Sequence, residues 1–286
     1  AYSFALHREV EDSTALVIND VTVGNIEHPG NTDTYTFSLA TDSKLLFDSL
    51  VSNNRLEFTL TGPDGTVVSA RNFNSSDSFD VGNSPVLALR AGSYTLRVAP
   101  TNDITGSYSF RLLNLATSAR AIALDARVTG TLSNAGHETD VMAFTANARE
   151  RIWLDVESIQ SGGPSWRLID ANGTVLAGPS NIQDSGYLTL GTAGTYYLLF
   201  EGRFNAAANN DYAFTLRKLQ QVSGLGKASQ DFDTPGGTPY VLVNGNGSDA
   251  QVLSGGPSGD FLRLAAATQF NTSNAVFFSR TADGPY

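Results

Sequence analysis

The chain has 286 residues, no cysteine, and 28 acidic against 18 basic side chains, which gives a formal net charge of −10. The length suggests about two domains. The acidic balance argues against a nucleic-acid partner, because phosphates are neutralised by clustered Lys and Arg. No apolar run approaches the ~20 residues that a membrane helix needs, and the absence of cysteine excludes disulfides and thiolate metal sites.

A Tyr-x-Phe pattern divides the chain into copies of one module. It occurs as Tyr2-Ser3-Phe4, Tyr108-Ser109-Phe110 and Tyr212-Ala213-Phe214, at spacings of 108 − 2 = 106 and 212 − 108 = 104 residues. In its second and third occurrences the pattern closes a module. We therefore expect repeats at residues 13–117 and 118–220, and we expect residues 1–12 to be the last strand of a preceding repeat plus a linker.

Both copies predict the same strands in the same order. The predicted strands and turns are a strand at 33–37 (140–144 in the second copy), two strands around the turn Asp64-Gly65 (Asn172-Gly173), a hairpin at Ala91-Gly92 (Ala193-Gly194) and a closing strand at 108–112 (212–216). Apolar residues alternate at period two, so one face of each strand should be buried. Asp-Gly and Asn-Gly favour tight turns. The fold class predicted is all-β, as tandem antiparallel jelly-roll-like β-sandwiches with little helix.

Several motifs of the repeats resemble a known bacterial module. They are the Asp-x-Tyr-x-Phe strand at Asp33, the Gly-Pro-Asp-Gly turn at Gly62, the Leu-x-Ala-Gly-x-Tyr-x-Leu segment at 89–96 and the closing Tyr-x-Phe-x-Leu at Tyr108. Together they resemble the bacterial pre-peptidase C-terminal (PPC) domain, over about residues 13–220 and in two copies. The second copy departs from the pattern, with Met142 in place of Tyr35. The resemblance implies non-catalytic sandwiches that accompany secreted peptidases or large surface proteins, some of which bind calcium or matrix polymers.

Residues 221–286 differ in composition from the repeats. Glycine and proline gather after Leu219, which indicates a linker. The apolar segments that follow, at 240–243, 259–264 and 274–278, resemble the opening strands of a concanavalin A-like sandwich of the L-type lectin or laminin-G kind. The sequence contains half-modules at both ends. They suggest strand donation between neighbouring molecules, or cut sites as the simpler explanation.

Residues for catalysis are scarce. The only histidines are His7, His28 and His137, and no Gly-x-Ser-x-Gly or His-x-x-x-His occurs. A serine triad or a catalytic zinc site needs such residues, so we expect no enzyme activity. His28 and His137 are predicted to lie in corresponding exposed loops.

Two aspartates and two tryptophans are the candidate binding residues. Asp33 and Asp140 begin the same strand in each copy and are weak calcium candidates, since calcium takes carboxylate oxygens. The alternative is that each accepts backbone hydrogen bonds in the preceding turn. Trp153 and Trp166 are predicted to be packing residues, with a sugar-stacking platform as the alternative. No other cofactor is expected.

These observations favour a non-catalytic structural or adhesive segment of a large exported bacterial surface or extracellular protein, with a filament among the candidate forms. Its partners would then be neighbouring copies or domains of the same protein. The alternative is an accessory module of a secreted multidomain enzyme that binds a polysaccharide or matrix polymer, with calcium as a cofactor in one version.

Overall fold

The computed structural model describes residues 13–76, 80–81, 83–159, 163–203, 205–219, 249–256 and 259–265. The chain divides into two compact units, Ala1–Gln220 and Gln221–Tyr286. The strand predicted within residues 1–12 lies outside the described residues, as do the predicted segments at 240–243 and 274–278. In the described parts of the chain, no helix is long and apolar enough to cross a membrane.

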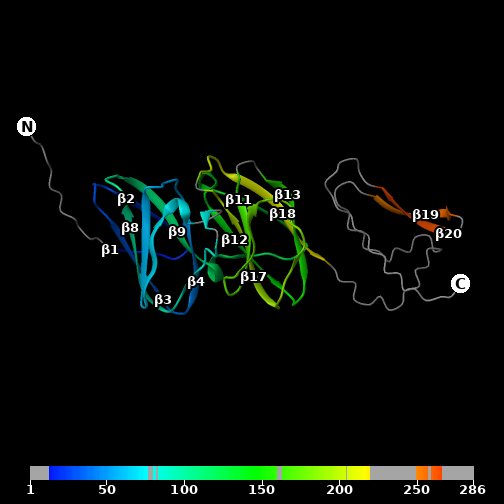
Figure 1. Cartoon of the computed structure of the whole chain (residues 1–286), viewed down its shortest axis with the longest axis horizontal. Coiled ribbons are helices and arrows are strands. Elements are labelled where there is room, and N and C mark those ends of the chain that lie inside the picture. The colour runs from blue at the N-terminus through cyan, green and yellow to red at the C-terminus, as the bar shows by residue number, and fades with distance from the viewer. Residues whose placement is uncertain are drawn as a thin grey trace, which may run out of the picture. The chain divides into compact units, whose positions relative to one another are not determined.

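The first strands form sandwich 1, in which two sheets face each other (Figure 1). Its elements are β1 (Ser13–Ala15), β2 (Val21–Ile26), β3 (Asp33–Leu39), β4 (Ser43–Ser49), β5 (Leu56–Gly62), β6 (Gly65–Asn72), the 3₁₀ turn η1 (Phe73–Ser75), β7 (Leu87–Leu89), β8 (Gly92–Pro100) and β9 (Gly106–Asn114). Sheet A has the strand order β1-β3-β8-β5-β6, and sheet B has the order β2-β9-β4-β7.

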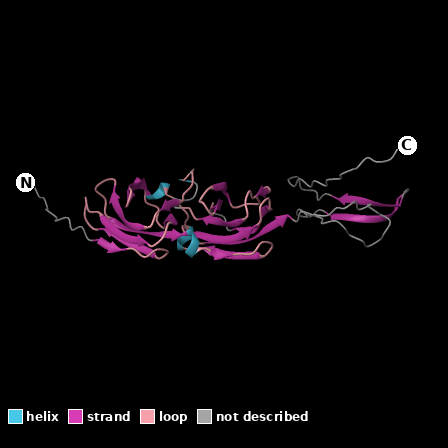
Figure 2. Cartoon of the chain, turned by 90° about the horizontal axis from the view of Figure 1, so that it is seen from below, coloured by secondary structure: helices cyan, strands magenta, loops and turns pink. Residues whose placement is uncertain are grey.

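Sandwich 2 repeats this topology strand for strand. Its elements are β10 (Arg120–Ala121), β11 (Arg127–Leu132), the 3₁₀ turn η3 (Asn134–Gly136), β12 (Thr139–Ala146), β13 (Arg151–Ile159), β14 (Ser165–Asp170), β15 (Val175–Asn181), β16 (Leu188–Thr189), β17 (Gly194–Glu201) and β18 (Asn210–Leu219). Sheet C has the order β10-β12-β17-β14-β15, and sheet D has the order β11-β18-β13-β16. A one-turn helix, α1 (Leu115–Ser118), connects the sandwiches. Figure 2 shows how little helix accompanies the strands.

The fold is all-β, as predicted, with two differences in detail. The edge strands β1 and β10 pair in parallel with β3 and β12, whereas the other pairings are antiparallel. The hairpins predicted at Ala91-Gly92 and Ala193-Gly194 are wrong, because each turn passes from one sheet to the other: β7 belongs to sheet B and β8 to sheet A. A positive-φ glycine suits either connection, and Gly92 has φ 147°. The predicted turn at Asp64-Gly65 does join the neighbouring strands β5 and β6.

Each sandwich has a core of its own between its two sheets. Core 1 is aromatic: the rings of Phe47 and Phe58 stack with centroids 3.9 Å apart, and Phe110 and Phe73 surround them. Core 2 also combines aromatic and aliphatic side chains and includes Met142. Each large apolar side chain contributes about 1.5–3 kcal/mol when it is fully buried. Each sandwich is therefore stabilised by its own core.

In the second compact unit, β19 (Asp249–Gly256) pairs antiparallel with β20 (Gly259–Ala265).

Candidate functional site at the junction of the two sandwiches

The two calcium candidates, Asp33 and Asp140, accept hydrogen bonds from the repeated Tyr-x-Phe motif. The hydroxyl of Tyr108 donates to Asp33 Oδ2 at 2.5 Å, and that of Tyr212 donates to Asp140 Oδ2 at 2.6 Å. Tyrosine and aspartate come from opposite sheets of the same sandwich. In both copies the motif therefore ties one sheet to the other.

A glycine beside each tyrosine makes room for this bridge. Gly24 lies opposite Tyr108 on the neighbouring strand, and Gly130 lies opposite Tyr212. A Cβ atom on Gly24 would be 2.2 Å from the Tyr108 ring, and one on Gly130 would be 2.1 Å from the Tyr212 hydroxyl oxygen. The Gly, Tyr and Asp of each repeat are thus parts of one structural motif.

The electrostatics of the bridge keep its hydrogen bonds in place. Burial raises the pKa of both Tyr108 and Tyr212, and the neighbouring carboxyl groups raise it further, so the hydroxyls stay protonated and donate. Burial also raises the pKa of Asp140. Within the described ranges, no group of three or more His, Asp or Glu side chains is arranged to hold a metal ion. Calcium binding at Asp33 or Asp140 stays an untested prediction.

An apolar layer joins the two sandwiches where sheet B faces sheet C. In Figure 1, β4 and β9 of sandwich 1 are next to β12 and β17 of sandwich 2. The buried residues of this layer are Leu46, Leu113, Leu115, Val141, Ile169 and Leu199. The layer is separate from the cores of the two sandwiches, so the junction forms a third buried cluster.

Arg111 makes the first polar contact across this junction. On its own sheet its guanidinium donates to Asp48 Oδ2, at 2.8 Å from Nε. Across the junction it donates to the Thr139 carbonyl at 3.1 Å and pairs with Glu138 at 3.4 Å. Asp48 is only 1% exposed, and burial raises its pKa although the arginine opposes this shift. Arg111 thus pairs with the buried Asp48 carboxyl group of sandwich 1 and also contacts sandwich 2.

Arg167 makes the second polar contact and is fully buried. Its Nε donates to Glu201 Oε1 at 2.9 Å within sheet C. The other nitrogens reach sandwich 1, where they donate to the carbonyl oxygens of Asn83 at 2.9 Å and Val81 at 3.1 Å. Ser165 adds a hydrogen bond to Glu201 at 3.0 Å. Burial raises the pKa of Glu201, with the arginine opposing the shift.

His137 also belongs to the junction, and the prediction that it lies in an exposed loop is wrong. The ring is half-buried. Nδ1 lies 2.9 Å from the carbonyl oxygen of Leu50 in sandwich 1, and Nε2 lies 3.0 Å from that of Ala206 in sandwich 2. Asn134 donates to the same Leu50 oxygen at 3.1 Å. Both ring nitrogens face backbone carbonyls, so the side chain acts as a connector in this arrangement.

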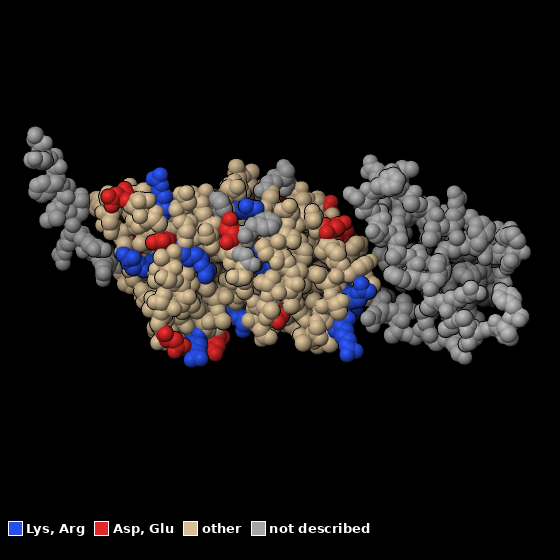
Figure 3. Space-filling view, in the orientation of Figure 1, with Lys and Arg blue, Asp and Glu red and all other residues tan. Residues whose placement is uncertain are grey.

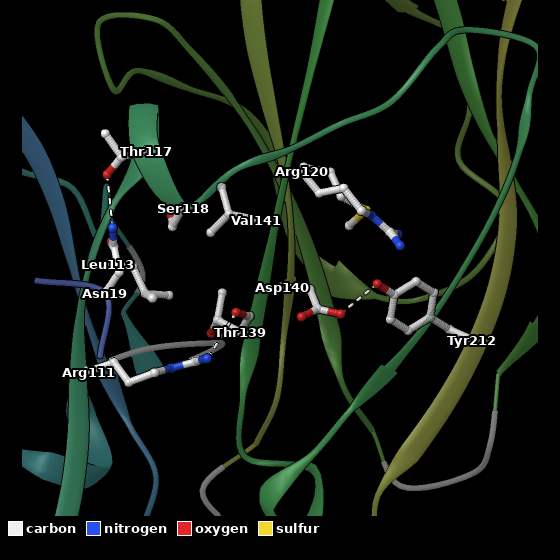
Figure 4. A pocket seen from close by; sticks show the side chains of 11 residues that line it. Asn19, Arg111, Leu113, Thr117, Ser118, Arg120, Thr139, Asp140, Val141 and Tyr212 are labelled. Carbon is white, nitrogen blue, oxygen red and sulfur yellow. Dashed lines mark hydrogen bonds between the residues drawn. The ribbon is translucent and has the colours of Figure 1, made fainter. Parts of the chain in front are cut away.

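A hollow of about 330 Å³ at the junction is lined by side chains of both sandwiches (Figure 4). Sandwich 1 contributes Asn19 and Arg111 to its lining, and sandwich 2 contributes Arg120, Asp140 and Tyr212. Its other lining groups include hydroxyls, and neither His nor Cys is among them. The polar groups of the lining are hydrogen-bonding groups, and among them the Asp140 carboxylate accepts from Tyr212.

The two tryptophans differ in position. Trp166 is 5% exposed and belongs to core 2, as predicted. Trp153 is half-buried on the outer face of sheet D, where its ring centroid lies 5.9 Å from that of Tyr187. Tyr187 is 47% exposed, and the Arg151 guanidinium lies 4.9 Å from its centroid. Sequence reasoning missed Tyr187 and Arg151, because only the pairing of β13 with β16 brings them together.

Comparison with known proteins assigns no family. The sequence matches no protein-family model and no curated protein sequence. Distant structural neighbours include the CUB1-EGF-CUB2 domains of rat MASP-1, at 11% identity and a TM-score of 0.22. That match covers 73% of this chain and 100% of that chain. A second is the CUB1-EGF-CUB2 domain of human MASP-1/3, at 10% identity and a TM-score of 0.24, with 68% of this chain and 99% of that chain covered. A third is the ANX1 ectodomain from Arabidopsis thaliana, at 9% identity and a TM-score of 0.22, with 68% of this chain and 82% of that chain covered. At these scores neither function nor family carries over, and the resemblances to the PPC and concanavalin A-like domains stay predictions.

Proposed function

We propose that residues 13–219 are a stiff, non-catalytic spacer, two sandwiches long, in an exported bacterial surface or extracellular protein. The observation that carries the proposal is the buried junction between sheets B and C. Domains within a chain usually move relative to each other unless their interface is large and hydrophobic. Here an apolar layer, the half-buried Arg111 and the buried Arg167 connect the sandwiches.

The junction favours stiffness for two physical reasons. Bending it would expose the apolar side chains of Leu113 and Leu199 to water, which costs about 25 cal/mol for each Å². Bending would also pull Arg167 away from the carbonyl oxygens of Asn83 and Val81, and a buried donor without a partner is costly. Repetition of such units lengthens a protein without enlarging any core.

Surface charge fits an exported spacer. On the face shown in Figure 3, acidic and basic side chains are scattered and form no single basic patch. A net charge of −10 favours solubility and opposes random association. The partners proposed are neighbouring domains or copies of the same large protein, in keeping with a structural or adhesive role.

The stiffness can be measured with spin labels, because the chain has no native cysteine to interfere. Labels on Thr36→Cys and Asn181→Cys, one exposed position in each sandwich, should give a narrow distance distribution by pulsed electron resonance. Adding Val141→Thr and Ile169→Thr, which makes sheet C resemble sheet A, should broaden it. A wild-type distribution as broad as that of the variant would contradict the proposal.

Carbohydrate binding is the second candidate function, and the Trp153–Tyr187 pair favours it. Aromatic rings beside Arg151 on an exposed sheet face could stack on a sugar ring while the guanidinium donates to hydroxyl groups. Glycan-array binding should then fall at least tenfold in Trp153→Ala and stay unchanged in Val67→Ala, a control at an exposed valine of sandwich 1. Equal binding by both variants, or none by the wild type, would remove this candidate.

A further inference from the structure

The strand β2 leaves one edge of sheet B unpaired in the described part of the chain. It stands at the end of the order β2-β9-β4-β7 and is hydrogen-bonded to β9. Val21 and Val23 project from it and are 53% and 71% exposed, and the preceding Val17 is 60% exposed. Exposed valines on an open strand edge are unusual in a soluble protein, because such edges template pairing with other chains.

The sheet register shows which backbone groups of β2 face outward. In β9 the Ser109 carbonyl accepts from Leu50 N at 3.1 Å, on the side away from β2. Successive residues of a strand point their backbone groups to opposite sides, so the residues on either side of Ser109 point theirs toward β2. Their partners are Thr22 and Gly24. The N–H and C=O groups of Val21, Val23 and Asn25 therefore point away from β9.

The equivalent edge in sandwich 2 is closed by charged side chains. Gly24 and Gly130 both lie opposite the motif tyrosine, so Thr129 on β11 corresponds to Val23. Its carbonyl accepts from the Arg120 guanidinium at 2.9 Å.

Arg127 stands at the position equivalent to Val21 and pairs with Glu157. Sandwich 1 lacks both features. Thr14 occupies the place of Arg120, since Thr14 pairs with Tyr35 as Arg120 pairs with Met142. Charged residues on edge strands are a known means of preventing strand addition. β11 carries Arg127 and is contacted by Arg120 of β10, whereas β2 has no charged residue.

We propose that β2 is a docking edge for an extended protein segment that adds to sheet B as an additional strand. The occupant is a peptide strand of another protein, with apolar and polar residues in alternation. A strand is the partner that matches the unpaired N–H and C=O groups of Val21, Val23 and Asn25. Its apolar side chains would pack beside the two exposed valines, as cross-strand neighbours do.

The direct test uses a fluorescein-labelled peptide of alternating threonine and valine with a lysine at each end. Fluorescence anisotropy should show saturable binding to the full chain at one peptide per chain. Val23→Lys should weaken binding at least tenfold, whereas Thr129→Lys, the matched change on β11, should leave it unchanged. A peptide with proline in place of its central valine lacks an N–H there and should bind at least tenfold more weakly.

Removing the charged groups at the edge of β11 provides a gain-of-function test. The double variant Arg120→Ala/Arg127→Val removes Arg127 from β11 and the β10 side chain of Arg120 that caps the Thr129 carbonyl. It should raise the stoichiometry from one peptide to two. Amide hydrogen exchange reports on folding and on the site together. In the free chain the amides of Val21 and Val23 should exchange faster than that of Thr22, and the peptide should slow them.

The proposal fails if Val23→Lys binds the peptide as well as the wild type does, or if the proline peptide binds equally. It also fails if the amides of Val21 and Val23 are already protected in the free chain, because the edge would then be occupied. None of these three results bears on the stiffness of the junction, which the spin-label distances measure.

Discussion

Sheet A and sheet C occupy the same place in their sandwiches but have different outward faces. Equivalent positions follow from the strand registers, which pair Leu60 with Leu96 in sandwich 1 and Leu168 with Leu198 in sandwich 2. The residue after each of these points outward. The outward positions are Thr34, Thr61 and Arg97 on sheet A and Val141, Ile169 and Leu199 on sheet C.

This difference shows how a repeated module becomes either a surface or an interior layer. The inward side chains of both sheets build similar cores, and the topology is unchanged. Three apolar replacements, together with the buried Arg167–Glu201 pair, turn the outward face of sheet C into part of the junction. The replacements can be reversed or transplanted one at a time.

The largest effect is expected from breaking the Arg167–Glu201 pair. Glu201→Ala removes the carboxylate partner of the buried Arg167 guanidinium, and such losses typically cost about 3–5 kcal/mol. Urea unfolding measures the change in the free energy of unfolding. The double variant Arg167→Met/Glu201→Leu, which removes both charges, should recover most of the loss. A cost for Glu201→Ala below about 1 kcal/mol would show that water reaches Arg167.

Leu199→Thr comes next and makes sheet C more like sheet A. Losing buried methyl groups and placing a hydroxyl in an apolar layer should cost about 2–4 kcal/mol. The two sandwiches should then unfold in separate calorimetric transitions. Arg97→Leu, at the equivalent exposed position of sheet A, should change stability by less than about 0.5 kcal/mol. Equal costs at the two positions would contradict the comparison.

Gly24→Ala and Gly130→Ala test the tyrosine bridge in each sandwich. A Cβ atom at either site overlaps the motif tyrosine, and overpacking of this kind costs about 1–3 kcal/mol. The cost should be larger at Gly24, because that Cβ would also lie 2.4 Å from the Tyr35 hydroxyl oxygen. This hydroxyl is hydrogen-bonded to that of Tyr108. Thermal denaturation of the two variants gives the order. The reverse order would mean that Tyr108 moves aside more easily than Tyr212.

Asp140→Asn should have the smallest effect, visible as a change in pH dependence. Burial raises the pKa of Asp140 above its ordinary value of 3.8, so the folded state binds this proton more tightly than the unfolded state does. Its contribution to stability is therefore fully present below pH 3.8 and is lost as the pH rises through the folded pKa. Asparagine does not titrate.

The stability of Asp140→Asn relative to the wild type should therefore increase as the pH rises from about 4 to neutrality. Melting temperatures across that interval measure the difference. Identical profiles for the two proteins would show that the Asp140 carboxyl is as well solvated as in the unfolded chain.

Local patterns made much of each sandwich predictable. Strict alternation, as in Thr34-Tyr35-Thr36-Phe37, predicts a strand with one buried face. The recurring Tyr-x-Phe and the glycine and aspartate that accompany it marked the repeats, although their contact with one another could not be read from spacing. The junction also has a signal in the sequence, which period-two alternation alone does not capture. In the second copy, adjacent apolar residues such as Val141-Met142 and Leu198-Leu199 indicate a strand that is buried on both faces.

The sequence by itself determined the all-β class, the repeat and the side chains that point inward, because period-two alternation is a local property of an extended chain. The tertiary structure alone decided that Ala91-Gly92 passes between sheets, that His137 bridges two carbonyls and that Arg167 reaches sandwich 1. The physical reason is that a side chain's periodicity reports which face is buried, whereas the partner of that face lies far away in sequence and is chosen by packing.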